Sequence, residues 1–434
     1  MVFKIKNFGK ITEANIKLDG ITVICGDNNS GKSTVGKALF SFFNALYDLN
    51  NKISENKLNK IRSFLYSQAF SFTGHSGYSF RNDDSFSDFI VREKISAKEL
   101  KKYIDDHILL PGHVKLTQDS LAPLVEALNA PISEVINELV LRNFDSVMNG
   151  QIKNDNSTGK CSINAIFKDE NSRKNNSNEI VFYKSGCKCD NLNVLIQHTA
   201  YYINSPFVLD WLNNPERVNI MRFMNLMDRS TIDAIVKAQA DINADSMSNI
   251  LESVTNRADM KIVEDVLNHA YRGNTKISNG KYFYTDENGK EFDFRNISAG
   301  LKSFALIERM LKTGVLKRKD VLILDEPEIH LHSEWQIIYA ELIVILQKTF
   351  DLTILLVTHS SQFLESLIYY MEKYGVADKG NYYIPVQNEK GVTISDSTDN
   401  LTKMKKSLKS GMYTLANKKL DELTRGDSDE EDNE

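Results

Sequence analysis

The sequence has few cysteines, no long apolar segment and no large excess of either charge. Its four cysteines, Cys25, Cys161, Cys187 and Cys189, are too few and too scattered among 434 residues for a disulfide framework. Cys187 and Cys189 lack a second Cys/His pair at ligand spacing, which favours free thiols over half a zinc site. No stretch approaches the about 18 uncharged apolar residues of a membrane span, and the amino-terminal segment has no apolar core like that of a signal peptide. We therefore expect a reduced, cytoplasmic protein without a membrane partner.

Charge is nearly balanced along most of the chain. The sequence carries 53 basic against 58 acidic side chains, for a formal net charge of -5. Six of the acids lie in Gly426–Glu434, which leaves 52 acids against 53 basic side chains elsewhere. This balance excludes a general positive field that would attract nucleic acid, so any such site must be a local patch. We expect residues 425–434 to form a disordered acidic tail.

Secondary-structure signals predict a core that is interrupted by helical inserts. Three short β-rich segments fill residues 1–25, and strands alternate with helices between residues 299 and 373. That alternation favours a parallel sheet with helices on its faces. The resulting division is 1–50 (core with a glycine-rich loop), 51–150 (helical insert), 151–206 (strands of the core or of an antiparallel subdomain), 207–275 (second helical insert), 276–424 (core) and 425–434 (tail).

A glycine-rich loop joins the third strand to the first helix. Residues 26–33 match G-x-x-x-x-G-K-[ST], with an apolar strand before them and an amphipathic helix after them. Glycines let successive backbone N–H groups point at phosphate oxygens, and the helix amino terminus adds partial positive charge. The loop therefore predicts a nucleoside triphosphate with Mg²⁺, in which Lys32 reaches the β- and γ-phosphates and Ser33 ligates the metal. The predicted nucleotide contacts are Gly26, Asn28, Asn29, Ser30, Gly31, Lys32, Ser33 and Thr34.

Two further buried strands end in polar residues. Val321–Leu324 leads directly into Asp325 and Glu326, and Thr353–Val357 leads towards His359. The carboxyl ends of parallel strands meet at one sheet edge, where folds with such a loop hold Mg²⁺. We expect Asp325 to bind the metal through a water molecule, Glu326 to polarise the attacking water as general base, and His359 to contact the γ-phosphate.

A short segment ahead of the acidic strand, Ile297–Ser303, precedes a predicted helix. Ser298 is placed to cap that helix, whose free N–H groups would then meet a phosphate. An ordinary helix cap has the same residues, so the segment alone leaves both interpretations open.

In this order the motifs resemble those of ABC-type ATPases: a phosphate-binding loop, a signature (ISAGLK), a Walker B strand (LILDEP) and a switch histidine (VTHS). The run DEPEIHLH, followed by a strand and THS, resembles the branch that contains the SMC, RecF and OLD-family ATPases. Within that branch the chain is most similar to ATP-binding proteins of bacterial anti-phage systems, such as the ATPase subunit of Septu (PtuA). The resemblance implies an α/β P-loop ATPase head, with a mixed sheet flanked by helices, an antiparallel β subdomain and a large, mainly helical insert.

The resemblance also implies that catalysis takes place across a dimer. In ABC-type ATPases each ATP lies between the phosphate-binding loop of one subunit and the signature of the other, so this chain would need a homodimer or a higher oligomer. Ser298 and Gly300 would then contact the γ-phosphate that the partner's Lys32 holds. The segment His330–Ser333 would cross the dimer seam.

Two departures from the family pattern bear on activity. Ala299 and Leu301 stand where the signature has a glycine and a glutamine. The glutamine of the Q-loop is also not evident: Gln68 is one candidate, although the strand end Tyr202–Pro206 is more similar to the corresponding segment of OLD-like proteins. These departures leave open a protein that binds ATP without hydrolysing it.

The resemblance further implies a regulatory ATPase of an anti-phage module, with ATP and Mg as its cofactors. The chain shows neither an H-N-H nor a TOPRIM nuclease pattern, so we expect a separate nuclease or toxin as partner. Two alternatives stay open. One is an ATP-bound, non-hydrolysing scaffold that sequesters an effector, and the other is a RecF-like DNA repair ATPase that binds DNA or another nucleic acid.

Overall fold

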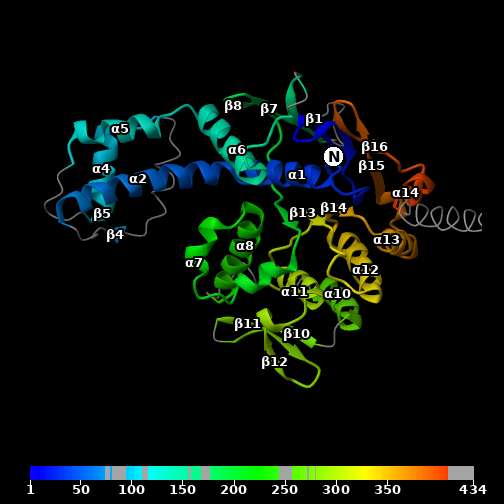
Figure 1. The fold of residues 1–434 in the computed structure, drawn as a ribbon. Helices are drawn as coiled ribbons and strands as arrows, with labels where there is room; N and C mark the ends of the chain where they lie inside the picture. The colour runs from blue at the N-terminus through cyan, green and yellow to red at the C-terminus, as the bar shows by residue number, and fades with distance from the viewer. Residues whose placement is uncertain are drawn as a thin grey trace, which may run out of the picture.

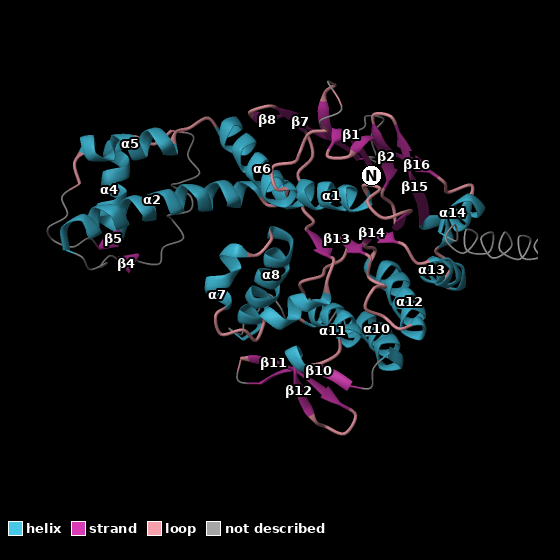
Figure 2. Cartoon of the chain, viewed as in Figure 1, coloured by secondary structure: helices cyan, strands magenta, loops and turns pink. Residues whose placement is uncertain are grey.

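The computed structural model describes residues 1–73, 79–80, 94–109, 116–154, 157, 159–167, 176–243, 257–270, 273–278 and 280–408. A large sheet with helices around it forms the body of the molecule, and a helical lobe projects from one side (Figure 1, Figure 2). The predicted α/β class, with a mixed sheet flanked by helices and a smaller antiparallel sheet, is confirmed. The expected tail at 425–434 lies outside the described residues.

Eleven of the described strands form one sheet, in the order β8-β7-β6-β1-β2-β16-β15-β3-β14-β13-β9. Its antiparallel part consists of β1 (Val2–Phe8), β2 (Ile11–Lys17), β6 (Cys161–Phe167), β7 (Asn176–Tyr183) and β8 (Gly186–Leu192). Its parallel part consists of β3 (Ile21–Cys25), β9 (Ala200–Ile203), β13 (Val321–Asp325), β14 (Thr353–Thr358) and β15 (Gly380–Asn388). Strand β16 (Gly391–Asp396) joins the two parts, because it pairs antiparallel with β15 and parallel with β2.

The parallel strands deliver their carboxyl ends to a single edge of the sheet. Strand β14 pairs in parallel with β3 on one side and with β13 on the other, and β13 pairs in parallel with β9. All residues of β3 and β9 are buried, as expected for strands that are covered on both faces. The ends of these four strands, Cys25, Thr358, Asp325 and Ile203, therefore lie along the edge where α/β sheets bind ligands.

Two apolar cores cover the two faces of the sheet. One core holds α1 (Lys32–Leu46) and α6 (Ile132–Met148), and the buried residues of α1 recur at helical spacing. The other core holds α8 (Leu226–Asn243), α10 (Arg257–Ala270), α11 (Ala299–Lys312), α12 (Ser333–Phe350) and α13 (Ser361–Lys373). The first helix begins at Lys32, so the lysine of the loop belongs to its first turn.

The projecting lobe has a small core of its own. The described part of this lobe consists of α2 (Leu49–Thr73), α4 (Ala97–His107), α5 (Gln118–Leu128) and the two-residue strands β4 (Ser79–Phe80) and β5 (Ile108–Leu109). Helix α6 lies within the stretch predicted as a helical insert, 51–150, yet it packs on α1 and β8 in the main core. The described part of the projecting lobe therefore ends with α5.

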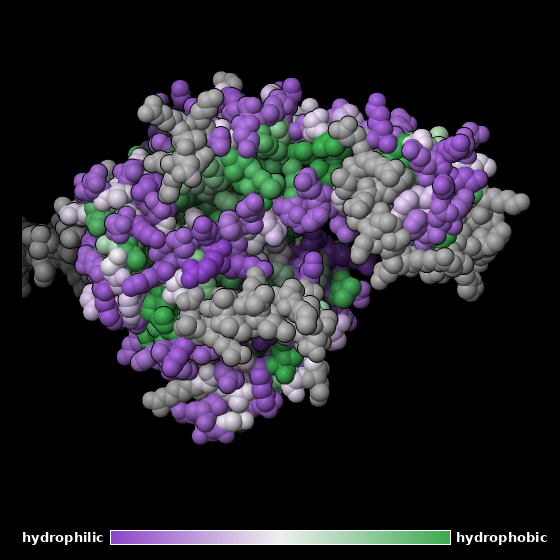
Figure 3. Space-filling model, turned by 180° about the vertical axis from the view of Figure 1, so that it is seen from behind, coloured by the Kyte–Doolittle hydropathy of each residue, from purple (hydrophilic) through white to green (hydrophobic). Residues whose placement is uncertain are grey.

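The remaining described elements lie on the α11 side and at the carboxyl end of the chain. A three-stranded antiparallel sheet consists of β10 (Gly273–Ser278), β11 (Lys281–Asp286) and β12 (Glu291–Asp293), and a hairpin around Asn288-Gly289 joins its last two strands. Short helical turns are η1 (Pro206–Trp211), α7 (Arg217–Ile220), η2 (Met221–Phe223), η3 (Phe294–Asn296) and η4 (Ala377–Lys379), and α14 (Leu401–Leu408) follows β16. None of the described helices is both long and apolar enough to cross a bilayer. Seen from behind, the surface is mainly hydrophilic, with apolar residues gathered in a hollow near its upper middle (Figure 3).

Candidate nucleotide-binding site

The glycine-rich loop of residues 26–33 curls at the end of β3. Gly31 has a φ of 83° and Asn29 a φ of 62°, both in the left-handed region. A side chain at Gly31 would be strained by this φ, and its Cβ would also come within 2.8 Å of Ile11 Cδ1. The Ser30 hydroxyl donates to the carbonyl oxygen of Asp27 at 2.6 Å, which closes the turn. The loop therefore has the backbone conformation that its sequence predicts.

Lys32 is the buried cation of this loop. Its side chain is 3% exposed, and its ammonium donates to the Asp27 carbonyl oxygen and, at 3.1 Å, to Ser30 Oγ. Burial lowers the pKa of Lys32, while the charges of Glu326 and Asp325 act in the opposite direction. A buried ammonium whose hydrogen-bond partners are neutral gains from an anion, because charge-assisted hydrogen bonds are the stronger ones.

The other predicted contacts of the loop surround Lys32. Gly26 is buried, Asn28 and Asn29 are exposed at the tip, and Thr34 is half-buried in the first turn of α1. The amide oxygen of Asn29 accepts a hydrogen bond from Lys10, in the turn between β1 and β2. The tip of the loop is thus tied to the antiparallel part of the sheet.

Asp325 and Ser33 meet across the sheet edge as predicted. Ser33 Oγ donates to Asp325 Oδ1 at 3.1 Å, and the hydroxyl of Tyr202 donates to Asp325 Oδ2. Tyr202 is buried on β9, and burial, followed by the charge of Asp325, raises its pKa well above the ordinary value, so the hydroxyl keeps its proton. Gly36 lets α1 lie close, because a Cβ there would come within 3.0 Å of the Tyr202 ring. The role of Tyr202 was not predicted from the sequence.

Glu326 and His359, the predicted base and switch residue, are in direct contact. His359 Nε2 lies 2.9 Å from Glu326 Oε1. Glu326 has a φ of 54°, and its N–H donates to the carbonyl oxygen of Val357 on β14 at 2.8 Å. A left-handed residue other than glycine costs about 1–3 kcal/mol and persists where its surroundings impose it. Here the surroundings are the turn that leads the chain from β13 past the end of β14.

Glu328 is a second residue that the sequence did not single out. It is buried, and its Oε1 accepts from the Thr358 hydroxyl and from the backbone N–H groups of His359 at 2.9 Å and Ser360 at 3.2 Å. Burial raises the pKa of Glu328, and these hydrogen bonds oppose that shift. Glu328 therefore fixes the turn that carries His359. The only sequence signal for it is an acid two residues after Glu326.

The signature residues lie at the start of α11, and the structure gives each a local reason. Ser298 is exposed, and its Oγ accepts from the N–H of Leu301 at 3.3 Å as the cap of the helix. Gly300 is buried, and a Cβ there would come within 2.9 Å of the Trp335 ring and 3.0 Å of the His330 carbonyl oxygen. Within the described residues no hydrogen bond joins Ser298 to the glycine-rich loop. The predicted contact of Ser298 and Gly300 with a nucleotide on a second subunit stays a prediction.

The two Q-loop candidates have different positions. Gln68 lies on α2, which runs away from the sheet edge into the projecting lobe (Figure 1). Tyr202, at the start of the alternative segment, contacts Asp325 directly. Directly after that segment, Phe207 packs against His330 with ring centroids 5.3 Å apart, so it reaches the segment predicted to cross a dimer seam. The segment from Tyr202 onward is therefore the one that is in contact with the site.

Cys187 and Cys189 are both free thiols on β8. Among the described residues no group of three or more His, Cys, Asp or Glu side chains is placed to hold a metal ion. A zinc site at this pair has no further ligands in the described part of the chain.

Solved structures with a similar fold include three SMC head domains. The SMC head domain from Thermotoga maritima shares 8% identity at a TM-score of 0.39, with 91% of this chain and 97% of that chain covered. The Smc head domain with an extended coiled coil bound to the C-terminal domain of ScpA, derived from Pyrococcus furiosus, shares 10% identity at a TM-score of 0.41, with 96% and 98% covered. A SmcHead bound to the C-winged helix domain of ScpA shares 11% at 0.43, with 91% and 97% covered. No curated protein matches the chain.

A family comparison matches most of the chain. Residues 1–364 of the 434 match a family described as AAA ATPase domain (AAA_15). The matched part includes the glycine-rich loop, the Ser33–Asp325 pair and the Glu326–His359 pair described above. The chain therefore belongs to the AAA ATPase domain family (AAA_15).

Proposed function

We propose that the chain is a Mg²⁺-dependent ATPase that binds ATP in the loop of residues 26–33 and hydrolyses it there. The observation that supports this most strongly is the 2.9 Å contact between Glu326 and His359, on the sheet edge that also carries Lys32. A carboxylate that is held by an imidazole beside a triphosphate site is placed to orient a water molecule and to accept its proton. Lys32 and the helix amino terminus behind it supply positive charge for the phosphates.

The donor set at the end of β13 fits a magnesium ion. Ser33 Oγ and Asp325 Oδ1 are oxygen atoms of the kind that Mg²⁺ prefers, and they lie 3.1 Å apart, so both would be near the same ion. In this proposal Ser33 and Asp325 would hold the ion, which would supply positive charge to the β- and γ-phosphates. Tyr202 binds the second oxygen of Asp325 and so fixes the orientation of the carboxylate.

Tyr202→Phe tests this orientation. The substitution removes one hydroxyl and keeps the ring that packs beneath α1, so the fold should persist. We expect the Mg²⁺ concentration for half-maximal ATP binding to rise about 10- to 100-fold, since partners of metal ligands typically contribute that much. The measurement is a Mg²⁺ titration of fluorescent ATP-analogue binding. Tyr201→Phe, which removes the hydroxyl that donates to the Val315 carbonyl oxygen at 3.0 Å, is the matched control. An unchanged Mg²⁺ requirement for Tyr202→Phe would assign its hydroxyl to packing only.

We propose that the active form is a homodimer in which Ser298 of each subunit faces the nucleotide of the other. Ser298 is exposed at the amino terminus of a 14-residue helix, and among the described residues no hydrogen bond joins it to the loop of residues 26–33 of the same chain. Nearby, Ile329 is 62% exposed and directly precedes the predicted seam segment His330–Ser333, and Phe207, 43% exposed, packs against His330 of that segment. Exposed apolar residues beside a helix amino terminus support a second copy of the chain as the cover.

Mixing two inactive variants tests this arrangement. Lys32→Ala keeps an intact signature, and Ser298→Arg keeps an intact phosphate-binding loop. If sites form across an isologous dimer, an equal mixture that exchanges subunits should recover about one quarter of the parent turnover, because each mixed dimer contains one intact site. Each variant alone should remain inactive. A mixture that stays as inactive as its components, although exchange is verified, would show that Ser298 does not act in trans.

For the biological role, we propose a regulatory subunit of an anti-phage module that controls a separate nuclease or toxin. This part is supported only by the resemblance of DEPEIHLH and THS to ATPases of such systems. Loss of phage protection in cells that carry Lys32→Ala beside an intact effector gene would support it, and full protection would contradict it.

A non-hydrolysing scaffold is the second candidate, because Ala299 and Leu301 replace signature residues. Tight ATP binding without turnover by the parent protein would select that alternative.

A further inference from the structure

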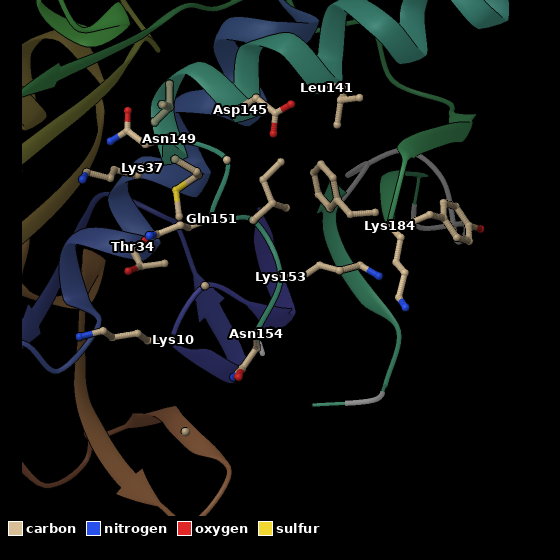
Figure 4. A pocket seen from close by; sticks show the side chains of 18 of the residues that line it. Lys10, Thr34, Lys37, Leu141, Asp145, Asn149, Gln151, Lys153, Asn154 and Lys184 are labelled. Atoms are coloured by element: carbon tan, nitrogen blue, oxygen red, sulfur yellow. The ribbon is translucent and has the colours of Figure 1, made fainter. Parts of the chain in front are cut away.

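A large cavity opens beside the phosphate-binding loop. Its volume is about 1280 Å³, above the roughly 300–1,000 Å³ of typical small-molecule sites. Its lining comes from the β1–β2 turn, from Asn29 at the tip of the phosphate-binding loop, from the first turns of α1, from the chain between the second half of α6 and residue 154, and from the β7–β8 turn. The β15–β16 hairpin lies at one margin (Figure 4). Neither the Ser33–Asp325 pair nor the Glu326–His359 pair belongs to its lining, so the cavity is distinct from both. It shares only Asn29 and Thr34 with the predicted nucleotide contacts.

The charged residues that line this cavity are mostly basic. They are four lysines, Lys10, Lys37, Lys153 and Lys184, and one acid, Asp145. In the described part of the chain none of the four lysines forms an ion pair, although Lys10 donates to the Asn29 amide. Like charges that gather in a concave site without neutralising partners concentrate the field and attract an anion.

The cations occupy two separate sides of the cavity. Figure 4 shows Lys10, Thr34 and Lys37 on the side of the phosphate-binding loop, and Lys153 and Lys184 across from them. Of these labelled residues, only Thr34, on the first side, belongs to the proposed ATP site. The second side therefore has positive charge that the proposed ATP site does not use.

Regular structure holds the second side in place. The backbone of Lys153 pairs with that of Phe8 at the end of β1. The carbonyl oxygen of the preceding residue, Ile152, accepts a hydrogen bond from the N–H of Gly9 at 2.8 Å. Lys184 is one of the two residues that connect β7 to β8. Short hairpin connections of this kind restrict the positions of their side chains.

An exposed aromatic residue lies beside these lysines. Tyr183, the last residue of β7, lines the cavity and is 51% exposed. Its neighbour Phe182 is instead buried and packs on Phe144 with ring centroids 4.9 Å apart, so it anchors the strand. Lysines along a groove together with an exposed aromatic ring are the combination that binds single-stranded nucleic acid, through phosphate contacts and base stacking.

We propose that this cavity binds a single-stranded nucleic-acid segment, with a phosphate between Lys153 and Lys184 and a base stacked on Tyr183. Three observations favour this class over a small anion: the size of the cavity, its amide side chains at Asn149 and Gln151, and the exposed ring. Amide side chains can form hydrogen bonds with the edges of bases and with sugars, whereas a simple anion offers no such groups. The binding requires neither ATP nor hydrolysis, so it stands apart from the proposed ATPase activity.

The test measures anisotropy of fluorescein-labelled oligothymidylate and oligouridylate, each of about ten nucleotides, with the full chain and without nucleotide. Lys153→Ala/Lys184→Ala should weaken binding at least tenfold. It should also reduce the slope of log affinity against log salt by about 1.4, since each single-strand phosphate contact contributes about 0.7. Tyr183→Ala should weaken binding about tenfold at unchanged slope. Whichever oligonucleotide binds more tightly identifies the strand as DNA or RNA.

The matched control removes the same charge elsewhere. Lys102→Ala/Lys188→Ala takes away two exposed lysines, one on α4 and one on β8 just past the turn, that do not line the cavity. It should bind like the parent. Equal losses in the cavity and control variants would overturn the proposal, as would absence of any binding by the parent. Complete displacement by ATP together with loss of binding in Lys32→Ala would also overturn it, because the cavity would then serve only the nucleoside of ATP.

Discussion

Glu326→Gln should lower ATP turnover by about 10²- to 10⁴-fold, the contribution typical of a positioned general base, while ATP binding is retained. Glutamine has the shape of glutamate, and its amide oxygen can still accept from His359 Nε2, which lies 2.9 Å from Glu326 in the parent. What the amide lacks is the ability to take a proton from water at neutral pH. The measurement is steady-state phosphate release beside fluorescent ATP-analogue binding on the same preparation.

The same substitution should change the oligomeric state in the presence of ATP and Mg²⁺. If ATP joins two copies of the chain, a variant that binds ATP without hydrolysing it should stay joined, whereas the parent should return to its resting state. Size-exclusion chromatography with light scattering measures this difference. Glu334→Gln, an exposed acid in the first turn of α12, is the matched control and should behave like the parent. Parent-like phosphate release from Glu326→Gln would show that another group activates the water.

The central part of the site could be predicted because its residues follow a simple rule. Buried apolar segments separated by helices form parallel strands, and parallel strands end at one edge. That rule is sufficient to bring Ser33 to within 3.1 Å of Asp325 across 292 positions in sequence. It also brings Glu326 to His359, because β13 and β14 are neighbours. In each pair the chemistry lies at the end of a strand, where local sequence is informative.

Features that depend on which strands are neighbours could not be predicted in this way. Strand β15 pairs with β3, more than 350 residues before it, and separates β3 from the antiparallel part of the sheet. Tyr202 had only the pattern of a buried strand, and its contact with Asp325 follows from the pairing of β9 with β13. Gly300 was assigned to a phosphate by resemblance, whereas the ring of Trp335 already explains its lack of a side chain. Periodicity reports which face of an element is buried and does not report its neighbours.

Lys32→Ala should weaken ATP binding about 100-fold or more, since it removes a buried charge-assisted contact to phosphate. In the parent this ammonium is 3% exposed and donates to the Asp27 carbonyl oxygen and to Ser30 Oγ. Alanine removes this donor from both oxygens. It also removes the cation that the loop would present to the triphosphate. The measurement is isothermal titration with ATP and Mg²⁺, together with thermal denaturation to show that the fold persists.

The control for this substitution must be another lysine that is at least half-buried and whose ammonium is bonded within the protein, because truncating any such side chain removes packing as well as charge. Lys52 on α2 meets that requirement: it is half-buried, burial lowers its pKa to about 8, and it donates to the carbonyl oxygen of Asn44. Lys52→Ala should lose some thermal stability and keep the ATP affinity of the parent. If both variants lost affinity in proportion to their loss of stability, the effect at Lys32 would reflect folding. A Lys32→Ala protein that binds ATP as tightly as the parent would remove the loop from the nucleotide site, because no other buried cation among the described residues lies between that loop and Asp325.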